Sequence, residues 1–310
     1  MKRTLPLLAL LLALLASPAR GAERLVLMLD WFPNVDHVPI YVALESGMFA
    51  EAGISLEVQS PTESADPLKL AASGNVDLAL SYQPQIIIAA AEGIPLKAAG
   101  RLVGSPLTTL LFIRGRGIES PSDLKGKTIG YTVPGMMDHL TEAFAAINGI
   151  DEYTTVNVGF SILQSLASGT VDAVMGPFKN YEPVSLEMEG FDPGYFEIER
   201  WGIPVYDELV FVTGASAYET KKDALVRFMD TIEKAIAFTA ERPEEALALY
   251  FKAVPDAPKD MERAAFERTL PFFGPDTLLD PARWRTFAAF ALRHGMIQKE
   301  VNTDEIVVAR

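Results

Sequence analysis

The segment from Asp30 to Gly47 gathers aromatic, amide, acidic and imidazole side chains between an apolar run and a helix-like stretch. Within it, Trp31 offers a flat apolar face, and Asn34 offers an amide that both donates and accepts hydrogen bonds. This combination suits a planar ring with polar edges, because stacking on an aromatic side chain contributes about 1–3 kcal/mol per ring. The segment is therefore a candidate ligand-binding loop.

A matching set of side chains, Asn180, Tyr181 and Glu182, stands between a later apolar run and another helix-like stretch. Tyr181 could stack on the face of a ring opposite Trp31, and a carboxylate such as Glu182 could accept hydrogen bonds from an exocyclic amine. Asn180 is a secondary candidate. A third polar loop, Ser81 to Gln85, also follows an apolar run. The first two clusters predict an aromatic sandwich with polar groups at the edge of the ring.

Structural roles compete with these functional ones. Trp31 and Tyr181 could be core aromatics at strand ends. Asn34 and Asp36 could be turn and helix-capping residues, which is the favoured interpretation for Asp36. His37 could equally cap the helix or pack inside the protein.

Other motifs give weaker signals. Gly135 follows a predicted strand at a helix N-terminus, where backbone N–H groups could hold a polar or anionic group, so it is a candidate ligand contact. The motif GKT at residues 126–128 resembles a phosphate loop, but Pro121 stands where the first glycine is required, and the motif precedes its strand. The three histidines are scattered, so no metal site is expected, and no catalytic triad is legible.

Strand-like and helix-like stretches alternate along most of the chain, and the final third is richer in helix. This alternation predicts mostly parallel α/β sheets, at whose carboxyl strand ends ligands bind. The motif AASGNVDLA at Ala71 to Ala79 recurs as LASGTVDAV at Leu166 to Val174. The same helix–glycine–strand corner is therefore expected twice, once in each of two lobes.

The predicted first lobe comprises residues 22–112 and 208–310, and the second comprises residues 113–207 with a hinge segment at each end. Hinge closure would bring the two aromatic clusters together around a ligand.

The N-terminus reads as a secretory signal peptide, residues 1–21, because Lys2 and Arg3 precede the apolar run LPLLALLLALLA and the small-residue stretch SPARGA. The run is shorter than the roughly 20 residues that span a bilayer. Cysteine is absent, which excludes disulfides, thiolate metal sites and a lipid-acceptor cysteine. With 27 basic and 41 acidic residues, nucleic acid is not an expected partner. A periplasmic location is expected.

The segments DWFPNVDHVPIYVALESGMFAEAGISLEV, SGNVDLALS, LKGKTIGY and NYEP together resemble the family of fungal thiamine-pyrimidine synthases and bacterial pyrimidine-precursor binding proteins. The resemblance covers nearly all of the chain after the signal segment. It implies a bilobed periplasmic-binding-protein fold of type II, with two α/β lobes around a ligand cleft.

The synthase branch of that family uses a lysine, a histidine and a cysteine-rich iron motif together with pyridoxal phosphate. By alignment, the lysine position falls on Ser81, the histidine on Gln85, and the cysteine motif on residues 203–207, IPVYD. The reactive groups of the synthase are therefore missing, so we expect neither enzymatic activity nor a cofactor.

The binding branch implies a receptor that delivers a formylaminopyrimidine or hydroxymethylpyrimidine to the membrane permease of an ABC importer, for thiamine salvage. By this resemblance Trp31 and Tyr181 are the aromatic walls and Asn34 and Glu182 the polar contacts. Secondary candidates are Asn180, Tyr206 and Asp207. Open alternatives are a synthase, a receptor for riboflavin or a sulfonate, and a sensory module without transport.

Overall fold

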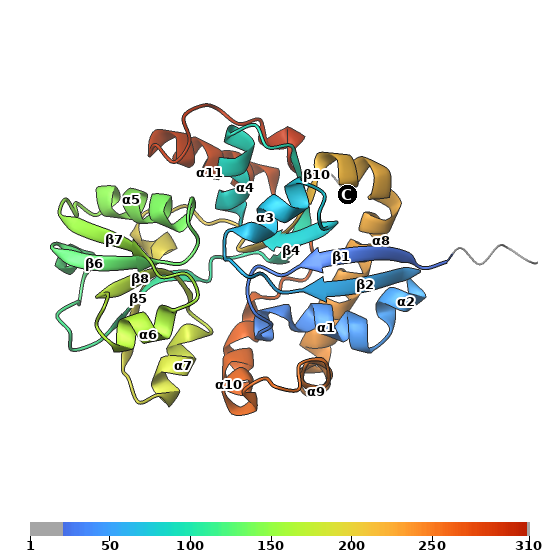
Figure 1. Ribbon diagram of the computed structural model, residues 1–310, viewed down its shortest axis with the longest axis horizontal. Coiled ribbons are helices and arrows are strands. Elements are labelled where there is room, and N and C mark those ends of the chain that lie inside the picture. Colours follow the sequence, from blue (N-terminus) through green and yellow to red (C-terminus); the bar gives the residue numbers. More distant parts are fainter. Residues whose placement is uncertain (1–20, 309–310) are drawn as a thin grey trace, which may run out of the picture.

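The computed structural model describes residues 21–308, which form two α/β lobes side by side (Figure 1). The predicted signal peptide lies outside the described residues except for Gly21. Among the residues described, no helix has both the length and the apolar character needed to cross a membrane.

The first lobe is built on a five-stranded sheet with the order β2-β1-β3-β10-β4. Its strands are β1 (Glu23–Met28), β2 (Ile54–Gln59), β3 (Leu78–Ser81), β4 (Leu96–Val103) and β10 (Leu209–Gly214). Strand β1 is parallel to β2 and β3, whereas β10 is antiparallel to β3 and β4. Every residue of β10 is buried, so a strand that follows the second lobe in sequence completes the core of the first.

Most helices belong to the first lobe. They are α1 (Val38–Glu45), α2 (Met48–Glu51), α3 (Asp66–Ala72), α4 (Gln83–Ala91), α8 (Ala215–Glu241), α9 (Pro243–Ala253), α10 (Lys259–Thr269) and α11 (Pro281–Arg293). Short 3-10 turns are η1 (Val35–His37), η4 (Leu270–Phe272) and η5 (Thr303–Glu305). The apolar side chains at helical spacing in α8 form a buried stripe that faces the core; they are Leu225, Phe228, Met229, Ile232 and Ile236.

The second lobe contains a five-stranded sheet with the order β7-β6-β8-β5-β9. Its strands are β5 (Thr108–Ile113), β6 (Lys127–Tyr131), β7 (Tyr153–Asn157), β8 (Ala173–Phe178) and β9 (Pro193–Glu197). Its helices are α5 (Met137–Ile147), α6 (Ile162–Ala167) and α7 (Glu182–Met188), with 3-10 turns η2 (Pro121–Leu124) and η3 (Ile198–Trp201). Strand β5 is antiparallel to both β8 and β9, as β10 is to its neighbours in the first lobe, whereas β6 is parallel to β7 and β8. Both sheets are therefore mixed, and the prediction of mostly parallel sheets holds only in that one strand of each sheet runs against the others.

The first boundary between the lobes lies earlier in the chain than predicted. We expected the first lobe to continue to residue 112, but β5 pairs with β8 and β9 of the second sheet, so the chain crosses over before Thr108. All of β5 is buried, as a central strand requires, and its continuous apolar run gave no sign of which sheet it joins. The return crossover lies between η3 and β10, close to the predicted boundary at residue 207.

The recurring motif marks equivalent corners of the two lobes. Gly74 and Gly169 both adopt a positive φ, of 75° and 72°, where a helix turns into the next strand. The aspartates that follow them make equivalent hydrogen bonds: Asp77 accepts from the Val26 N–H at 2.9 Å, and Asp172 accepts from the Thr128 N–H at 2.8 Å. The repeat in sequence is therefore a repeat in structure.

Candidate functional site

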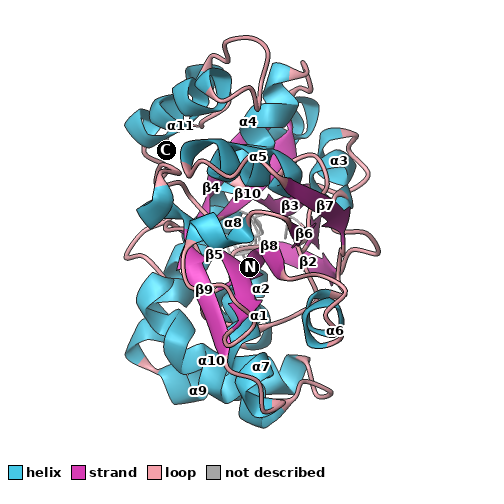
Figure 2. Cartoon of the chain, turned by 90° about the vertical axis from the view of Figure 1, so that its left-hand side faces the viewer, coloured by secondary structure: helices cyan, strands magenta, loops and turns pink. Residues whose placement is uncertain are grey.

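A pocket opens between the lobes at the carboxyl ends of the strands, with an empty volume of about 350 Å³. That figure includes space open to solvent; the cavity itself measures about 20 Å³, which is room for about one water molecule. The lining residues come from both lobes and are Asp30, Trp31, Asn34, Asp36, Tyr82, Thr132, Ile162, Gly176, Phe178, Tyr181 and Glu182. Figure 2 shows the strands of both sheets, seen from the side of the second lobe.

Four of the eight candidate residues line this pocket together: Trp31 and Asn34 from the first lobe, and Tyr181 and Glu182 from the second. The edge of Trp31 contacts Phe160 of the second lobe, with ring centroids 4.4 Å apart. The Tyr181 hydroxyl donates to Glu262 Oε1 of α10 at 2.8 Å. Both aromatic walls are therefore fixed by contacts that cross from one lobe to the other.

A buried hydrogen-bond network holds Asp30 at the floor of the first lobe. His37 Nδ1 accepts from the Asn34 backbone N–H at 3.3 Å, so the ring proton belongs on Nε2, which lies 2.9 Å from Asp30 Oδ1. The Tyr82 hydroxyl donates to the other oxygen, Asp30 Oδ2, at 2.9 Å. Both oxygens of Asp30 are thus engaged, and the network fixes the shape of the loop.

The structure gives the helix cap to Asn34, which also lines the pocket, and not to Asp36. Asn34 is the cap of η1: its side-chain oxygen accepts from the Asp36 N–H at 2.9 Å, and its amide donates to the Phe32 carbonyl at 3.2 Å. Asp36, expected to be the capping residue, lies within η1 and lines the pocket. The helix cap is therefore two residues earlier than expected, which is possible because asparagine and aspartate are about equally good caps.

Four carboxyl groups in and near the pocket have raised pKa values. Burial raises the pKa of Asp36 to about 7 and that of Glu182 to about 7. Burial likewise raises the pKa of Glu262 and of Glu208, each to about 7. Near neutral pH these side chains can therefore act as donors as well as acceptors of hydrogen bonds.

These raised pKa values predict that the protein loses stability as the pH rises from about 5 to about 7. Between those values the folded protein keeps protons that the unfolded chain releases, and each such proton lowers the free energy of unfolding by about 1.4 kcal/mol per pH unit. Urea unfolding at pH 5.5 and pH 8 should show the higher free energy of unfolding at pH 5.5. Glu262→Gln should reduce the difference, because glutamine stays neutral at both pH values; equal stability at both pH values would contradict this account.

The other four candidates do not line the pocket. Gly135 lies in a separate hollow. Asn180 is buried and bridges the lobes, since its amide donates to Asp36 Oδ1 and to Thr269 Oγ1, both at 2.7 Å. Tyr206 is fully buried, with its ring against Phe287.

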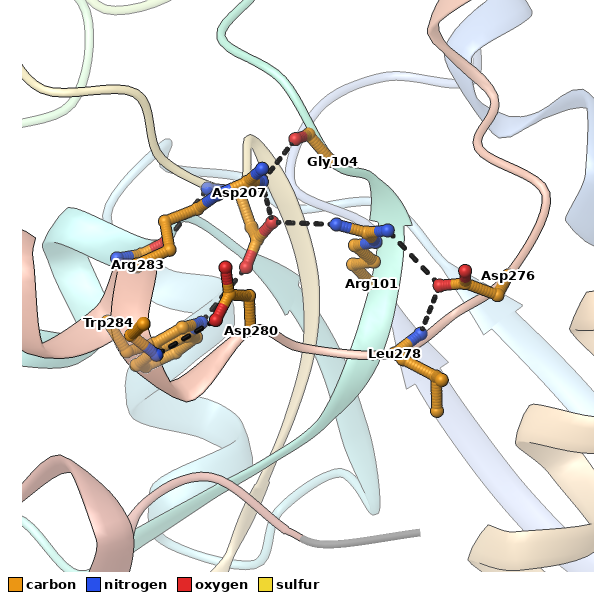
Figure 3. A network of polar contacts seen from close by, with 10 residues as sticks. Arg101, Gly104, Asp207, Asp276, Leu278, Asp280, Arg283 and Trp284 are labelled. Atoms are coloured by element: carbon orange, nitrogen blue, oxygen red, sulfur yellow. Dashed lines mark hydrogen bonds and ion pairs between the residues drawn. The ribbon is translucent and has the colours of Figure 1, made fainter.

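Asp207 is fully buried in a cluster of cationic side chains at the return crossover. Figure 3 shows Arg101, Arg283 and Trp284 converging on it. Arg283 Nη1 lies 2.6 Å from Asp207 Oδ1, and Trp284 Nε1 donates to Oδ2 at 2.9 Å. Arg283 also donates to the carbonyl of Gly104, in the other crossover. Asp207 and Arg283 therefore connect the two crossovers, and Asp207 does not line the pocket.

Several pocket residues were not expected: Asp30, Tyr82, Thr132, Ile162, Gly176 and Phe178. Tyr82 stands in the Ser81 to Gln85 loop, whose polar composition was the available signal. Gly176 has a φ of 122°, and a Cβ there would lie 2.0 Å from Thr132 Oγ1, so only glycine fits. The close approach of these strand ends depends on tertiary structure, which the motif around Gly176 does not reveal.

Comparison with known proteins identifies a matching family model and several relatives. A family model described as NMT1/THI5 like matches residues 34–246. A formylaminopyrimidine-binding protein of Halalkalibacterium halodurans is 36% identical over 258 residues, which cover 79% of this chain and 78% of that protein. A 4-amino-5-hydroxymethyl-2-methylpyrimidine phosphate synthase of Legionella pneumophila is 28% identical over 256 residues, covering 81% of this chain and 80% of that one.

Among solved structures, the alkanesulfonate-binding protein of Xanthomonas axonopodis pv. citri bound to MOPS has a TM-score of 0.73 at 17% identity, covering 93% of this chain and 99% of that one. Likeness at this identity establishes the fold, which is that of the periplasmic binding proteins. Two α/β lobes around a pocket, the matched family model and the relative at 36% identity agree with one another. The chain belongs to the NMT1/THI5-like family.

Proposed function

We propose that this protein is the periplasmic solute-binding component of an ABC importer, and that it binds an aminopyrimidine precursor of thiamine of the formylaminopyrimidine or hydroxymethylpyrimidine type. The observation that carries the proposal is the pocket, in which Trp31 and Tyr181 from opposite lobes stand beside the carboxyl groups of Asp36 and Glu182. The relative from Halalkalibacterium halodurans, named for formylaminopyrimidine binding, supports the same ligand class.

The charge of the pocket argues against an anionic solute. Its acidic side chains are Asp30, Asp36 and Glu182, and none of the lining residues within the described part of the chain is arginine or lysine. A sulfonate or phosphate would meet carboxyl groups where it needs cationic or N–H donors. An aminopyrimidine instead presents N–H groups to those acceptors and a flat face to the aromatic walls.

The contacts between the lobes suit a receptor that closes over its ligand. Besides the contacts of Asn180 and Tyr181, Ser64 Oγ of the first lobe donates to the Thr132 carbonyl of the second at 2.7 Å. Arg268 of α10 pairs with Glu187 of α7 at 2.6 Å, and these two helices lie next to each other (Figure 1). A ligand that touches both lobes binds the closed form more tightly and so shifts the population toward it.

The positions that align with the reactive residues of the synthases favour binding over synthesis. The Ser81 hydroxyl donates to Gln85 Oε1 at 2.7 Å, so a neutral hydrogen-bonded pair occupies the positions that align with the lysine and histidine. Neither side chain can form a Schiff base with pyridoxal phosphate. The family nevertheless contains both synthases and binding proteins, so activity remains the second candidate to test.

Native mass spectrometry of protein purified without refolding, followed by thermal-shift titration, tests the proposal. We expect a bound mass in the aminopyrimidine range. Added 4-amino-5-hydroxymethyl-2-methylpyrimidine or its formylaminomethyl analogue should raise the melting temperature, because a ligand at 100 times its Kd stabilises the folded state by about 2.7 kcal/mol. Riboflavin and an alkanesulfonate should give no shift.

A shift with the sulfonate or riboflavin alone would assign the protein to another solute. An absorption band of bound pyridoxal phosphate, with pyrimidine formed on incubation, would favour the synthase.

A further inference from the structure

One carboxylate oxygen in the pocket has no hydrogen-bond partner. Asp36 is 1% exposed, and its Oδ1 accepts from Asn180 Nδ2 at 2.7 Å, while its Oδ2 is buried and unpaired. Leaving such an oxygen buried without a partner destabilises the protein, and more so if the oxygen is charged. Since Asp36 lines the pocket, a donor on a bound ligand could remove this cost.

The position of Asp36 is fixed from both lobes. Its backbone N–H is held by Asn34 at 2.9 Å within η1, and Asn180 Nδ2 of the second lobe is shared with Thr269 Oγ1 of α10. The Thr269 hydroxyl in turn donates to the Ala265 carbonyl at 2.9 Å. With Oδ1 committed to this chain of hydrogen bonds, Asp36 presents Oδ2 in a constant position, and above its raised pKa of about 7 this atom is an acceptor.

Among the described residues, the titratable groups around Asp36 include one further donor, the Tyr250 hydroxyl, which is buried and interacts with Asp36 and Glu262 but makes no hydrogen bond to Oδ2. His37 has its two ring nitrogens engaged by Asn34 and Asp30. Glu182, across the pocket, accepts from the Phe178 N–H at 2.6 Å. Asp30 and Glu182 also act electrostatically on Asp36, and as carboxylates they repel its negative charge. The pocket itself is therefore the direction from which a donor can come.

We propose that Asp36 Oδ2 accepts a hydrogen bond from the exocyclic amine of the ligand and thereby determines specificity for 4-amino pyrimidines. This inference rests on the proposed function, because it names the group of the aminopyrimidine that Asp36 reads. Asn180 is then a positioning residue, which orients Asp36 and touches no ligand atom. The contact also links recognition to closure, because the hydrogen bond to Asn180 that orients Asp36 forms only when the lobes meet.

The proposal is tested by measuring the affinity of two ligands for two forms of the protein. Calorimetric titration would use 4-amino-5-hydroxymethyl-2-methylpyrimidine and the analogue with hydrogen in place of the 4-amino group, against the wild type and Asp36→Asn. Asparagine keeps an acceptor for Asn180 and turns a donor toward the pocket. We expect Asp36→Asn to weaken binding of the amine about tenfold or more, and binding of the amine-free analogue by less than about twofold.

Thr269→Val is the matched control, since it removes the other partner of Asn180 and leaves Asp36 intact. It should change the affinity for both ligands by the same factor. Asp36→Ala, checked for folding by circular dichroism, gives the same contrast if Asp36→Asn does not fold.

Equal weakening of both ligands by the Asp36 variants would overturn the proposal, because it would show that Asp36 acts only on closure. Unchanged affinity for the amine would overturn it too, and would indicate that water satisfies Oδ2 in the complex. Either result leaves the proposed function standing, provided that the wild type binds the amine. A wild type that binds neither pyrimidine would overturn both.

Discussion

Replacing Asp207 with alanine is expected to lower the free energy of unfolding by about 3–5 kcal/mol, because it leaves buried cationic groups without their counter-charge. Arg101 and Arg283 are only 16% and 24% exposed, and both face Asp207. The Trp284 indole N–H, which is fully buried, also loses its acceptor. Urea unfolding followed by circular dichroism measures the loss.

Asp276→Ala is the control for this prediction. Asp276 pairs with the same Arg101 at 3.1 Å but is 36% exposed, so its removal should cost no more than about 1 kcal/mol. If Asp207→Ala lowers the free energy of unfolding no more than Asp276→Ala does, the buried cluster does not stabilise the fold at the crossovers. Weakened ligand binding in an Asp207 variant of unchanged stability would instead restore Asp207 as a binding residue.

Loss of either aromatic wall should weaken aminopyrimidine binding by about 1–3 kcal/mol, which is about a 5- to 150-fold rise in Kd. Trp31 and Tyr181 line the pocket from opposite lobes, so Trp31→Ala and Tyr181→Ala each remove one face of the proposed sandwich. Calorimetric titration with 4-amino-5-hydroxymethyl-2-methylpyrimidine measures the effect.

Two further variants separate stacking from other effects. Tyr181→Phe keeps the ring and loses only the hydroxyl contact with Glu262, so most of the affinity should remain. Trp201→Ala removes a tryptophan that is 39% exposed and does not line the pocket, and it should leave Kd unchanged. Unchanged affinity in both Trp31→Ala and Tyr181→Ala would refute the sandwich.

The alternation of apolar runs and turn residues was enough to predict the α/β class and the paired lobes. This local pattern repeats around Gly74 and Gly169, and both corners fold alike. It was not enough to assign β5 to its sheet. A fully buried strand reads as a plain apolar run, and its partners are chosen by tertiary packing, which leaves no trace in its own sequence.

At the site, the residue types of the two clusters identified four of the pocket residues, because aromatic and polar side chains at strand ends are unusual enough to stand out. Asn34 and Asp36 could not be separated in the same way. Both residue types cap helices and both bind polar ligands. Only the positions of the backbone N–H groups decide which of the two residues is the helix cap. The burial of Asp207 against Arg283 could not be predicted, because the two residues are far apart in sequence.

The antiparallel strand β10 sets the order in which the chain can become folded. The second lobe is one uninterrupted segment from β5 to β9 and can form as soon as it has been synthesised. The first lobe has to wait, because β10, in the middle of its sheet between β3 and β4, is made only after the whole second lobe. A nascent chain that has just completed β9 would therefore carry a complete second lobe and a first sheet that still lacks the strand between β3 and β4. Filling that position requires contacts between residues far apart in sequence.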